Sequence, residues 1–183
     1  TKDSYLERNL YRIDMRSGKA IRINNEGGMH SAKLSPGAGY LLDTWESANI
    51  PSKTDIISGD GKFSRSVHLS PDPLKDYRFG ENKLITLKAA DGTTELTGRL
   101  ILPPDFDPSK RYPVIIYVYG GPHLQLITRG WHNDVRGWEY YMASKGYICF
   151  SLDNRGSANR GMAFENVVHR NMGIFETDDQ MKG

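Results

Sequence analysis

The sequence contains a single cysteine, Cys149, so no disulfide can form within the chain. Cys149 lies in the apolar run Tyr147–Phe150, where we expect a buried thiol that acts as a small hydrophobic side chain. No apolar run reaches the ~18 residues that a membrane-spanning helix needs. The sequence also lacks any Asn-x-Ser/Thr sequon. These absences exclude a disulfide-stapled scaffold.

The chain has no excess of charge of one sign. Its 24 Lys and Arg residues are nearly balanced by 22 Asp and Glu residues, which gives a net charge of +2. Because no basic cluster is present, we expect no nucleic-acid partner. His123, His132 and His169 have neither metal-ligand spacing nor a paired cysteine, so no metal site and no cofactor is expected.

Residues 1–75 read as short strands joined by turns. Alternating apolar and polar side chains mark strands at Leu10–Asp14, Ala20–Ile23, Ser31–Ser35, Tyr40–Trp45 and Lys53–Ile57. The glycines of Pro36–Gly39 and Ser58–Gly61 are interpreted as turn residues, since no phosphate-binding strand–loop–helix pattern surrounds them. Small sheets of this kind form the blades of β-propellers, and one blade cannot bury its apolar face alone. We therefore expect the end of a propeller here.

A connector containing Pro71 and Pro73 precedes a change of pattern. Beyond it, Lys83–Leu87 and Leu96–Leu102 are expected to form a hairpin through an Asp-Gly turn. Pro113–Tyr119 is apolar on both faces, as a central parallel strand should be. A helix over residues 138–145 and a buried strand at Tyr147–Leu152 would complete a βαβ unit.

The predicted fold class follows from this order of elements. We expect the N-terminal portion of an α/β hydrolase, a β-hairpin plus a βαβ unit, preceded by all-β strands from the last blade or blades of a β-propeller. The predicted domains are residues 1–75, the C-terminal end of the propeller, and residues 76–183, the first part of the hydrolase domain.

Two helix details follow from side-chain spacing. Trp138, Tyr141 and Met142 share one helix face at i, i+3 and i+4, and Gly146 suits the position after the helix end. Near the end of the sequence, Thr177 at N-cap and Gln180 at N3 match a capping box, which predicts a helix that starts there.

The chain resembles the dipeptidyl peptidase IV branch of the prolyl oligopeptidase family, and the resemblance is closest over residues 84–183. Tyr117–His123 is similar to the oxyanion-loop motif of those enzymes, and Leu152–Gly161 to the loop after their fourth hydrolase strand. His169–Gly173 and Glu176–Gln180 resemble the segment that leads towards their nucleophile. Together the motifs identify the chain as part of a serine peptidase of this family.

By this resemblance Tyr119 is the catalytic residue of the chain, because its hydroxyl would donate to the oxyanion of the tetrahedral intermediate. Tyr117 is interpreted as a packing residue. Gly120 and Gly121 would allow a tight turn close to the substrate, and Pro122 would make that turn rigid. Two roles are open for Arg155, either anchoring loops or contacting the substrate.

The Gly-x-Ser-x-Gly pentad of a nucleophile elbow does not occur in the sequence, and Ser157 lacks its pattern. The resemblance implies that the serine, aspartate and histidine of the triad lie downstream. We therefore expect the 183-residue chain to be inactive alone. We also expect it to expose the edge of the Val114–Tyr119 strand, because the next strand of the hydrolase order would pair there.

The resemblance implies a parent enzyme that releases dipeptides from peptide N-termini, with a preference for Pro or Ala, and that forms a homodimer. Tripeptidyl or acylaminoacyl release by the same family is an alternative, as is a non-catalytic binding homologue. A single-domain esterase disagrees with the blade-like first third of the chain. Bacterial members of the family are often periplasmic and animal members often membrane-anchored, and nothing in the sequence chooses between these locations.

Overall fold

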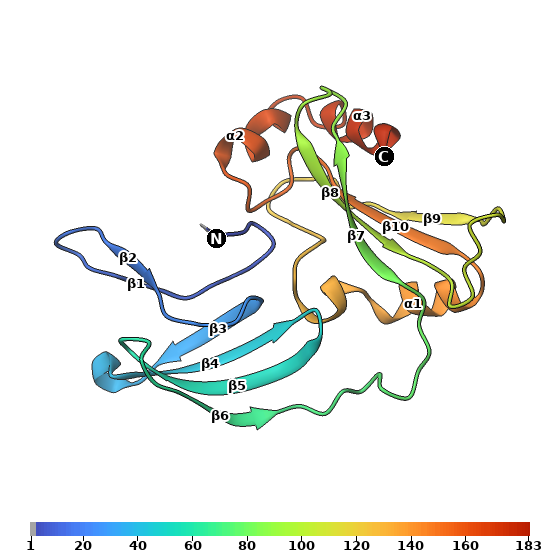
Figure 1. Cartoon of the computed structure of the whole chain (residues 1–183). Coiled ribbons are helices and arrows are strands. Elements are labelled where there is room, and N and C mark those ends of the chain that lie inside the picture. Colours follow the sequence, from blue (N-terminus) through green and yellow to red (C-terminus); the bar gives the residue numbers. More distant parts are fainter. Residues whose placement is uncertain (1–2) are drawn as a thin grey trace. The chain divides into compact units, whose positions relative to one another are not determined.

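The computed structural model describes residues 3–183, which fall into two compact units (Figure 1). The first unit contains the chain up to Lys75 together with Thr128–Asp134, and the second contains Asp76–Ile127 and Val135–Gly183. No pattern in the sequence predicts that Thr128–Asp134 belongs to the first unit. The domain bounds 1–75 and 76–183 stay a prediction.

The first unit is built from antiparallel strands. β1 (Tyr11–Ile13) and β2 (Ala20–Arg22) form the predicted hairpin. A second sheet has four strands in chain order: β3 (Met29–Leu34), β4 (Tyr40–Ser47), β5 (Ile50–Ser58) and β6 (Ser64–Leu69). Figure 1 shows these four strands as neighbours in one curved sheet, with the short 3-10 helix η1 (Pro36–Ala38) between β3 and β4. The sequence prediction missed β6, whose six residues are all exposed and mostly polar.

A polar cluster fills the buried side of this sheet. His30 stacks on Trp45 with ring centroids 5.2 Å apart, and its Nδ1 lies 2.7 Å from Asp43 Oδ2. The Trp45 indole N–H donates to Asp55 Oδ2 at 2.7 Å. Asp43 and Asp55 are directly opposite each other on β4 and β5. Side chains two residues apart on a strand share a face, which brings Asp43 and Trp45 into one cluster.

The second unit contains a four-stranded mixed sheet in the order β7-β8-β10-β9. Its strands are β7 (Asn82–Lys88), β8 (Glu95–Ile101), β9 (Val114–Tyr117) and β10 (Ile148–Asp153). β7 and β8 form the predicted hairpin, while β9 and β10 are parallel and are linked through the helix α1 (Gly137–Ser144). The predicted βαβ unit is therefore present.

The remaining helices are short. They are the 3-10 helix η2 (Trp131–Asp134) in the first unit, and α2 (Met162–Glu165), the 3-10 helix η3 (Asn166–Val168) and α3 (Phe175–Lys182) in the second. None of the helices in residues 3–183 has both the length and the apolar character needed to cross a membrane.

β9 lies at the edge of the sheet of the second unit. Within residues 3–183 it pairs with β10 on one side only, and the side chains of Val114 and Ile116 are half exposed. The expected exposure of this strand edge is confirmed for the described residues. An unpaired apolar edge is a template for pairing with another strand.

The helix predicted over residues 138–145 is present as α1. Its buried residues are Glu139, Tyr140 and Ala143, whereas Trp138 and Tyr141, which set the helical spacing, are exposed. Arg99 in the sheet beneath the helix binds Glu139, so the side of α1 that faces the sheet is not its aromatic side. Gly146 does follow the helix with a positive φ of 90°, as predicted.

One helix prediction needs correction, because α3 begins at Phe175 with Ile174 as its N-cap. Thr177 is therefore inside the helix, and its hydroxyl donates to the Gly173 carbonyl at 2.6 Å. The predicted capping box is wrong, although a helix is present. Glu176 accepts a hydrogen bond from the backbone N–H of Gly173 at 2.9 Å, and the N-cap lies three residues earlier than expected, at Ile174 instead of Thr177.

The two faces of β10 have different environments. Phe150 and Leu152 pack in an apolar cluster with Ala89 and Leu96. The opposite face carries a buried ion pair, in which Arg99 on β8 donates to both carboxylate oxygens of Glu139 at 2.8 and 3.1 Å. These two side chains are 2% and 1% exposed, so the pair is shielded from water. It fixes α1 against the sheet.

Glu139→Gln is expected to lower the free energy of unfolding by about 3–5 kcal/mol, because the Arg99 guanidinium would stay buried without its counter-charge. The exposed pair Lys88–Glu95, with side chains 53% and 62% exposed, provides a control. Glu95→Gln should cost less than about 1 kcal/mol. Urea unfolding of the two variants measures the difference, and equal losses would contradict the role given to Glu139.

Candidate functional site

The loop that follows β9 carries the sequence-predicted residues Tyr119, Gly120, Gly121 and Pro122, and we call Tyr119–His123 the glycine loop. It leaves β9 at the C-terminal edge of the sheet, where open α/β sheets bind ligands. The Tyr119 side chain is 51% exposed. Its hydroxyl donates a long hydrogen bond to the Pro122 carbonyl at 3.5 Å. The phenol therefore lies across its own loop, and about half of the residue is exposed.

The glycine loop is tightly turned. Gly120 has φ +75°, a conformation that favours glycine, and His123 has φ +68° despite its side chain. A Cβ at Gly121 would lie 3.5 Å from Cε1 of Tyr119, so the absence of a side chain keeps this position clear beside the phenol ring. A loop with this backbone needs partners outside itself to hold its shape.

Asn154, the residue after β10, is the first such partner. It is fully buried, and its amide Nδ2 donates to the Gly120 carbonyl at 3.0 Å and to the Arg155 carbonyl at 2.6 Å. Its Oδ1 accepts a hydrogen bond from Gln180 Nε2 at 2.8 Å, and Gln180 also donates to the Leu152 carbonyl at 3.0 Å. The orientation of the Asn154 amide is therefore set from α3.

Glu165, the last residue of α2, is the second partner. Its Oε1 accepts from the His123 backbone N–H at 3.0 Å and lies 3.1 Å from the His123 Nδ1. The His123 side chain is 89% exposed, so the backbone hydrogen bond to a carboxylate is the stronger part of this contact. The far end of the glycine loop is thereby attached to α2.

Asp153 holds the chain that continues from the glycine loop. Its carboxylate accepts hydrogen bonds from the backbone N–H groups of Leu126 at 2.8 Å and Ile127 at 3.0 Å. Burial raises the pKa of Asp153 to about 6, although both N–H donors favour the charged form. The ordered path of residues 124–127 thus depends on a buried acid at the end of β10.

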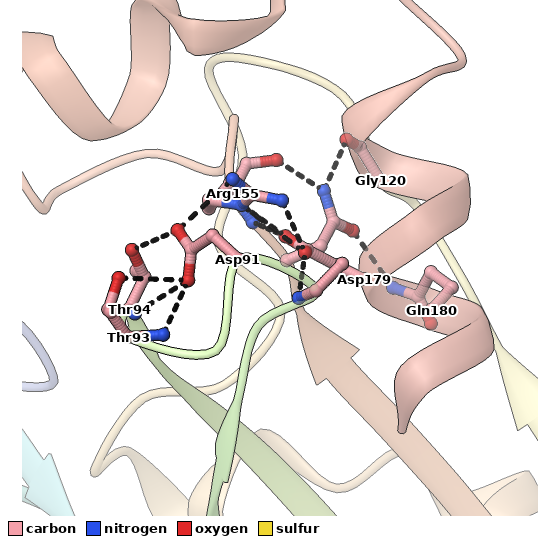
Figure 2. A network of polar contacts seen from close by, with 9 residues as sticks. Asp91, Thr93, Thr94, Gly120, Arg155, Asp179 and Gln180 are labelled. Atoms are coloured by element: carbon pink, nitrogen blue, oxygen red, sulfur yellow. Dashed lines mark hydrogen bonds and ion pairs between the residues drawn. The ribbon is translucent and has the colours of Figure 1, made fainter.

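Arg155 lies in a set of polar contacts that we call the Asp179 network: Asp91, Asn154, Arg155, Asp179 and Gln180. Figure 2 shows Asp91 and Asp179 on two sides of the Arg155 guanidinium. Asp179 is fully buried and accepts from Arg155 Nη2 at 2.8 Å, Arg155 Nε at 2.9 Å and the Arg155 backbone N–H at 3.0 Å. It also accepts from the Ala90 N–H at 2.9 Å.

Asp91 joins the network from the turn between β7 and β8. Its Oδ2 accepts from Arg155 Nη1 at 3.1 Å and from the Thr94 hydroxyl at 2.6 Å, and its Oδ1 accepts from the N–H groups of Thr93 and Thr94 (Figure 2). The Thr94 hydroxyl is the main reason why the pKa of Asp91 is well below its usual range. These contacts support the loop-anchoring role of Arg155 over substrate contact.

Sequence reasoning missed most of these partners. Asn154 and Asp153 are polar residues directly after a buried strand, which is a signal that could have been used. Asp179 and Gln180 belong to the predicted helix start and to the segment that carries the family resemblance, and neither pattern predicts their partners. Tyr117 packs against Trp138, with ring centroids 5.8 Å apart, and lies 4.3 Å from the guanidinium of Arg136.

No metal centre accompanies these residues. Within the part of the chain that the structure describes, no group of three or more His, Cys, Asp or Glu side chains is arranged to hold a metal ion.

Comparison with known proteins places this loop and its sheet in a family. Residues 133–183 match the model of the prolyl oligopeptidase family, and residues 1–52 match that of the dipeptidyl peptidase IV N-terminal region. The chain belongs to the prolyl oligopeptidase family. Mouse dipeptidyl peptidase 8 is 32% identical over 198 residues, an alignment that covers 100% of this chain and 21% of the relative. Dipeptidyl peptidase 4 of Trichophyton rubrum is 27% identical over 99% of this chain and 24% of the relative.

Solved structures of the prolyl oligopeptidase family agree with the fold. A crystal structure from Bacteroides ovatus, named for dipeptidyl aminopeptidase IV, has a TM-score of 0.91 and 42% identity, and covers 97% of this chain and 26% of its own. Porphyromonas gingivalis dipeptidyl peptidase 4 has a TM-score of 0.89 and 30% identity, with coverage of 99% and 26%. The chain spans about a quarter of these proteins or less. The predicted fold class, propeller strands followed by the start of an α/β hydrolase, is confirmed.

The pKa of Asp153 leads to a pH-dependent difference in stability. Because the folded-state pKa of about 6 is above the ordinary aspartate pKa of 3.8, the folded state binds more protons than the unfolded state between these values. This contribution to stability is present below pH 4 and is lost as the pH rises through 6.

Asp153→Asn should remove that slope. Relative to the variant, the wild-type free energy of unfolding should fall by up to about 3 kcal/mol between pH 4 and pH 7. Urea titrations at several pH values measure the free energy of unfolding of both proteins. Subtracting one from the other removes the contribution of carboxyls with lowered pKa values, because both proteins contain them. Parallel pH profiles for the two proteins would show that Asp153 titrates normally.

Proposed function

We propose that this chain is part of a serine exopeptidase that releases dipeptides from peptide N-termini, with a preference for Pro or Ala at the cut. The observation that carries the proposal is the Tyr119 hydroxyl, exposed on a tightly turned loop at the C-terminal edge of β9. The names of the relatives, dipeptidyl peptidase 8 and dipeptidyl peptidase 4, support the same activity.

In this proposal a serine from outside these 183 residues attacks the scissile carbonyl carbon, and a histidine takes the hydroxyl proton. The carbonyl oxygen becomes an oxyanion, to which Tyr119 donates a hydrogen bond. Collapse of the intermediate breaks the C–N bond as the histidine returns the proton to the leaving amine. Tyr119 contributes because its donor is oriented before negative charge develops.

The remaining assignments are part of the same proposal. Gly120 and Gly121 leave room for the substrate backbone, and Pro122 limits the motion of the turn. Residues 1–75 belong to a propeller domain and residues 76–183 to the hydrolase domain. Peptides are the substrates, the full-length protein is a homodimer, and neither a nucleic acid nor a cofactor takes part.

Tyr119→Phe tests the central role. Loss of one oxyanion donor should lower kcat by about 10²–10³-fold with little change in KM. The measurement is steady-state cleavage of a Gly-Pro chromogenic dipeptide substrate by the full-length protein, with a tripeptidyl and an N-acetylated substrate in parallel. Tyr141→Phe, an exposed tyrosine on α1, is the matched control and should leave kcat unchanged. A kcat for Tyr119→Phe equal to wild type would remove Tyr119 from the mechanism.

Labelling with a fluorophosphonate probe tests the location of the nucleophile. The full-length protein should be labelled, whereas the 183-residue chain alone should not, because it contains no Gly-x-Ser-x-Gly pentad. Intact mass spectrometry distinguishes the two species, since the chain has a mass of 20.6 kDa. Labelling at that mass would mean that an unrecognised nucleophile lies within it. An unlabelled full-length protein would favour a non-catalytic binding homologue.

A further inference from the structure

The geometry points to Asn154 and Glu165 as positioning residues that hold the glycine loop, and with it the Tyr119 hydroxyl, in its working orientation. This inference rests on the proposed function of Tyr119 and extends it to residues that touch neither substrate nor reacting atoms. The two residues come from different segments, the end of β10 and α2, and act on opposite ends of one short loop.

Asn154 acts next to Tyr119. Its amide donates to the carbonyl of Gly120, whose positive φ sets the direction in which the chain leaves Tyr119. A primary amide can rotate by about 180° and exchange the positions of its donor nitrogen and acceptor oxygen. Here Gln180 donates to Asn154 Oδ1, which fixes Nδ2 as the atom facing Gly120. Asn154 is fully buried and the contact is partly buried, so losing it leaves the Gly120 carbonyl without that donor.

Glu165 acts at the other end. The Pro122 carbonyl, to which the Tyr119 hydroxyl donates, belongs to the peptide bond whose N–H is that of His123. Glu165 accepts a hydrogen bond from this N–H at 3.0 Å. It therefore fixes the plane of the Pro122–His123 peptide, and with it the direction in which the Pro122 carbonyl meets the phenol. The positive φ of His123 adds a reason for this anchor, since the unsupported residue would relax.

Both anchors should affect catalysis through Tyr119. A displacement of the phenol by about 1 Å can cost up to about 10²-fold in rate. We expect Asn154→Ala and Glu165→Ala each to lower kcat by at least about tenfold, with a smaller change in KM. Glu165→Gln keeps an acceptor for the His123 N–H and should recover most of the lost activity.

A double-mutant cycle with Tyr119→Phe in the full-length protein separates positioning from general damage. If the anchors act through the Tyr119 hydroxyl, Asn154→Ala and Glu165→Ala should change kcat by less than about threefold once that hydroxyl is absent. Asn171→Ala and Glu95→Ala, both exposed, serve as matched controls. Kinetics are measured with the Gly-Pro dipeptide substrate.

The kinetic results distinguish failure of this inference from failure of the proposed function. Equal fold-losses in the wild-type and Tyr119→Phe backgrounds would overturn the inference, as would unchanged kcat in both single variants. If buried Asn154→Ala does not fold, the less buried Glu165 and its Gln rescue decide alone. A wild-type protein that cleaves no dipeptide substrate would instead defeat the proposed function. In that case the carbonyl ¹³C chemical shift of Gly120 in Asn154→Ala still reports whether the anchor exists, and an unchanged shift would refute it.

Discussion

The carboxylate of Asp179 is the constraint on which the second unit depends. It lies in a fully buried position on α3 and is bound by the guanidinium and backbone N–H of Arg155 and by the N–H of Ala90. A buried carboxylate without such donors would be costly, and with them it joins three separate chain segments. The turn after β7, the loop after β10 and the helix α3 are held together at this one group.

The contacts of Asp179 also position the glycine loop. Asn154 precedes Arg155, and Gln180 follows Asp179. The contact between Asn154 and Gln180 is therefore one residue away from the ion pair in both segments, the loop after β10 and α3. The position of the Gly120 carbonyl is thus linked to α3 through two side-chain amides. A residue as exposed as Tyr119 can then keep a defined direction because its neighbours are fixed from within the protein.

Strand patterns were predicted well, since alternation and apolar runs report directly on burial. β1 to β5 and β7 to β10 were all expected, and β6 was missed because Ser64–Leu69 shows neither pattern. The buried face of α1 could not be predicted, because Glu139 is buried only where Arg99 lies opposite it. No local pattern in the sequence can reveal such a partner forty residues away.

The candidate site was predicted only in part for a similar reason. The roles of Tyr119 and the glycines can be predicted from a local motif. The roles of Asn154, Glu165 and Asp179 depend on contacts between segments that are distant in the sequence. Arg155 could be assigned to loop anchoring or to substrate contact from residue type alone. Its two acidic neighbours, Asp91 and Asp179, become apparent only in the folded chain.

The return of Thr128–Asp134 to the first unit has a consequence for handling the protein. The backbone passes between the units near residue 75, after Ile127 and after Asp134. The returning segment is tied to the first unit through Arg129, which pairs with Leu6 and Glu7, and through His132, which donates to Ala48. A single protease cut at residue 75 would therefore divide the chain into two polypeptides, and the contacts of Thr128–Asp134 with the rest of the first unit would hold the two pieces together non-covalently. A protein expressed from residue 76 onward would contain Thr128–Asp134 without the residues that this seven-residue segment binds. Expression should therefore include both units.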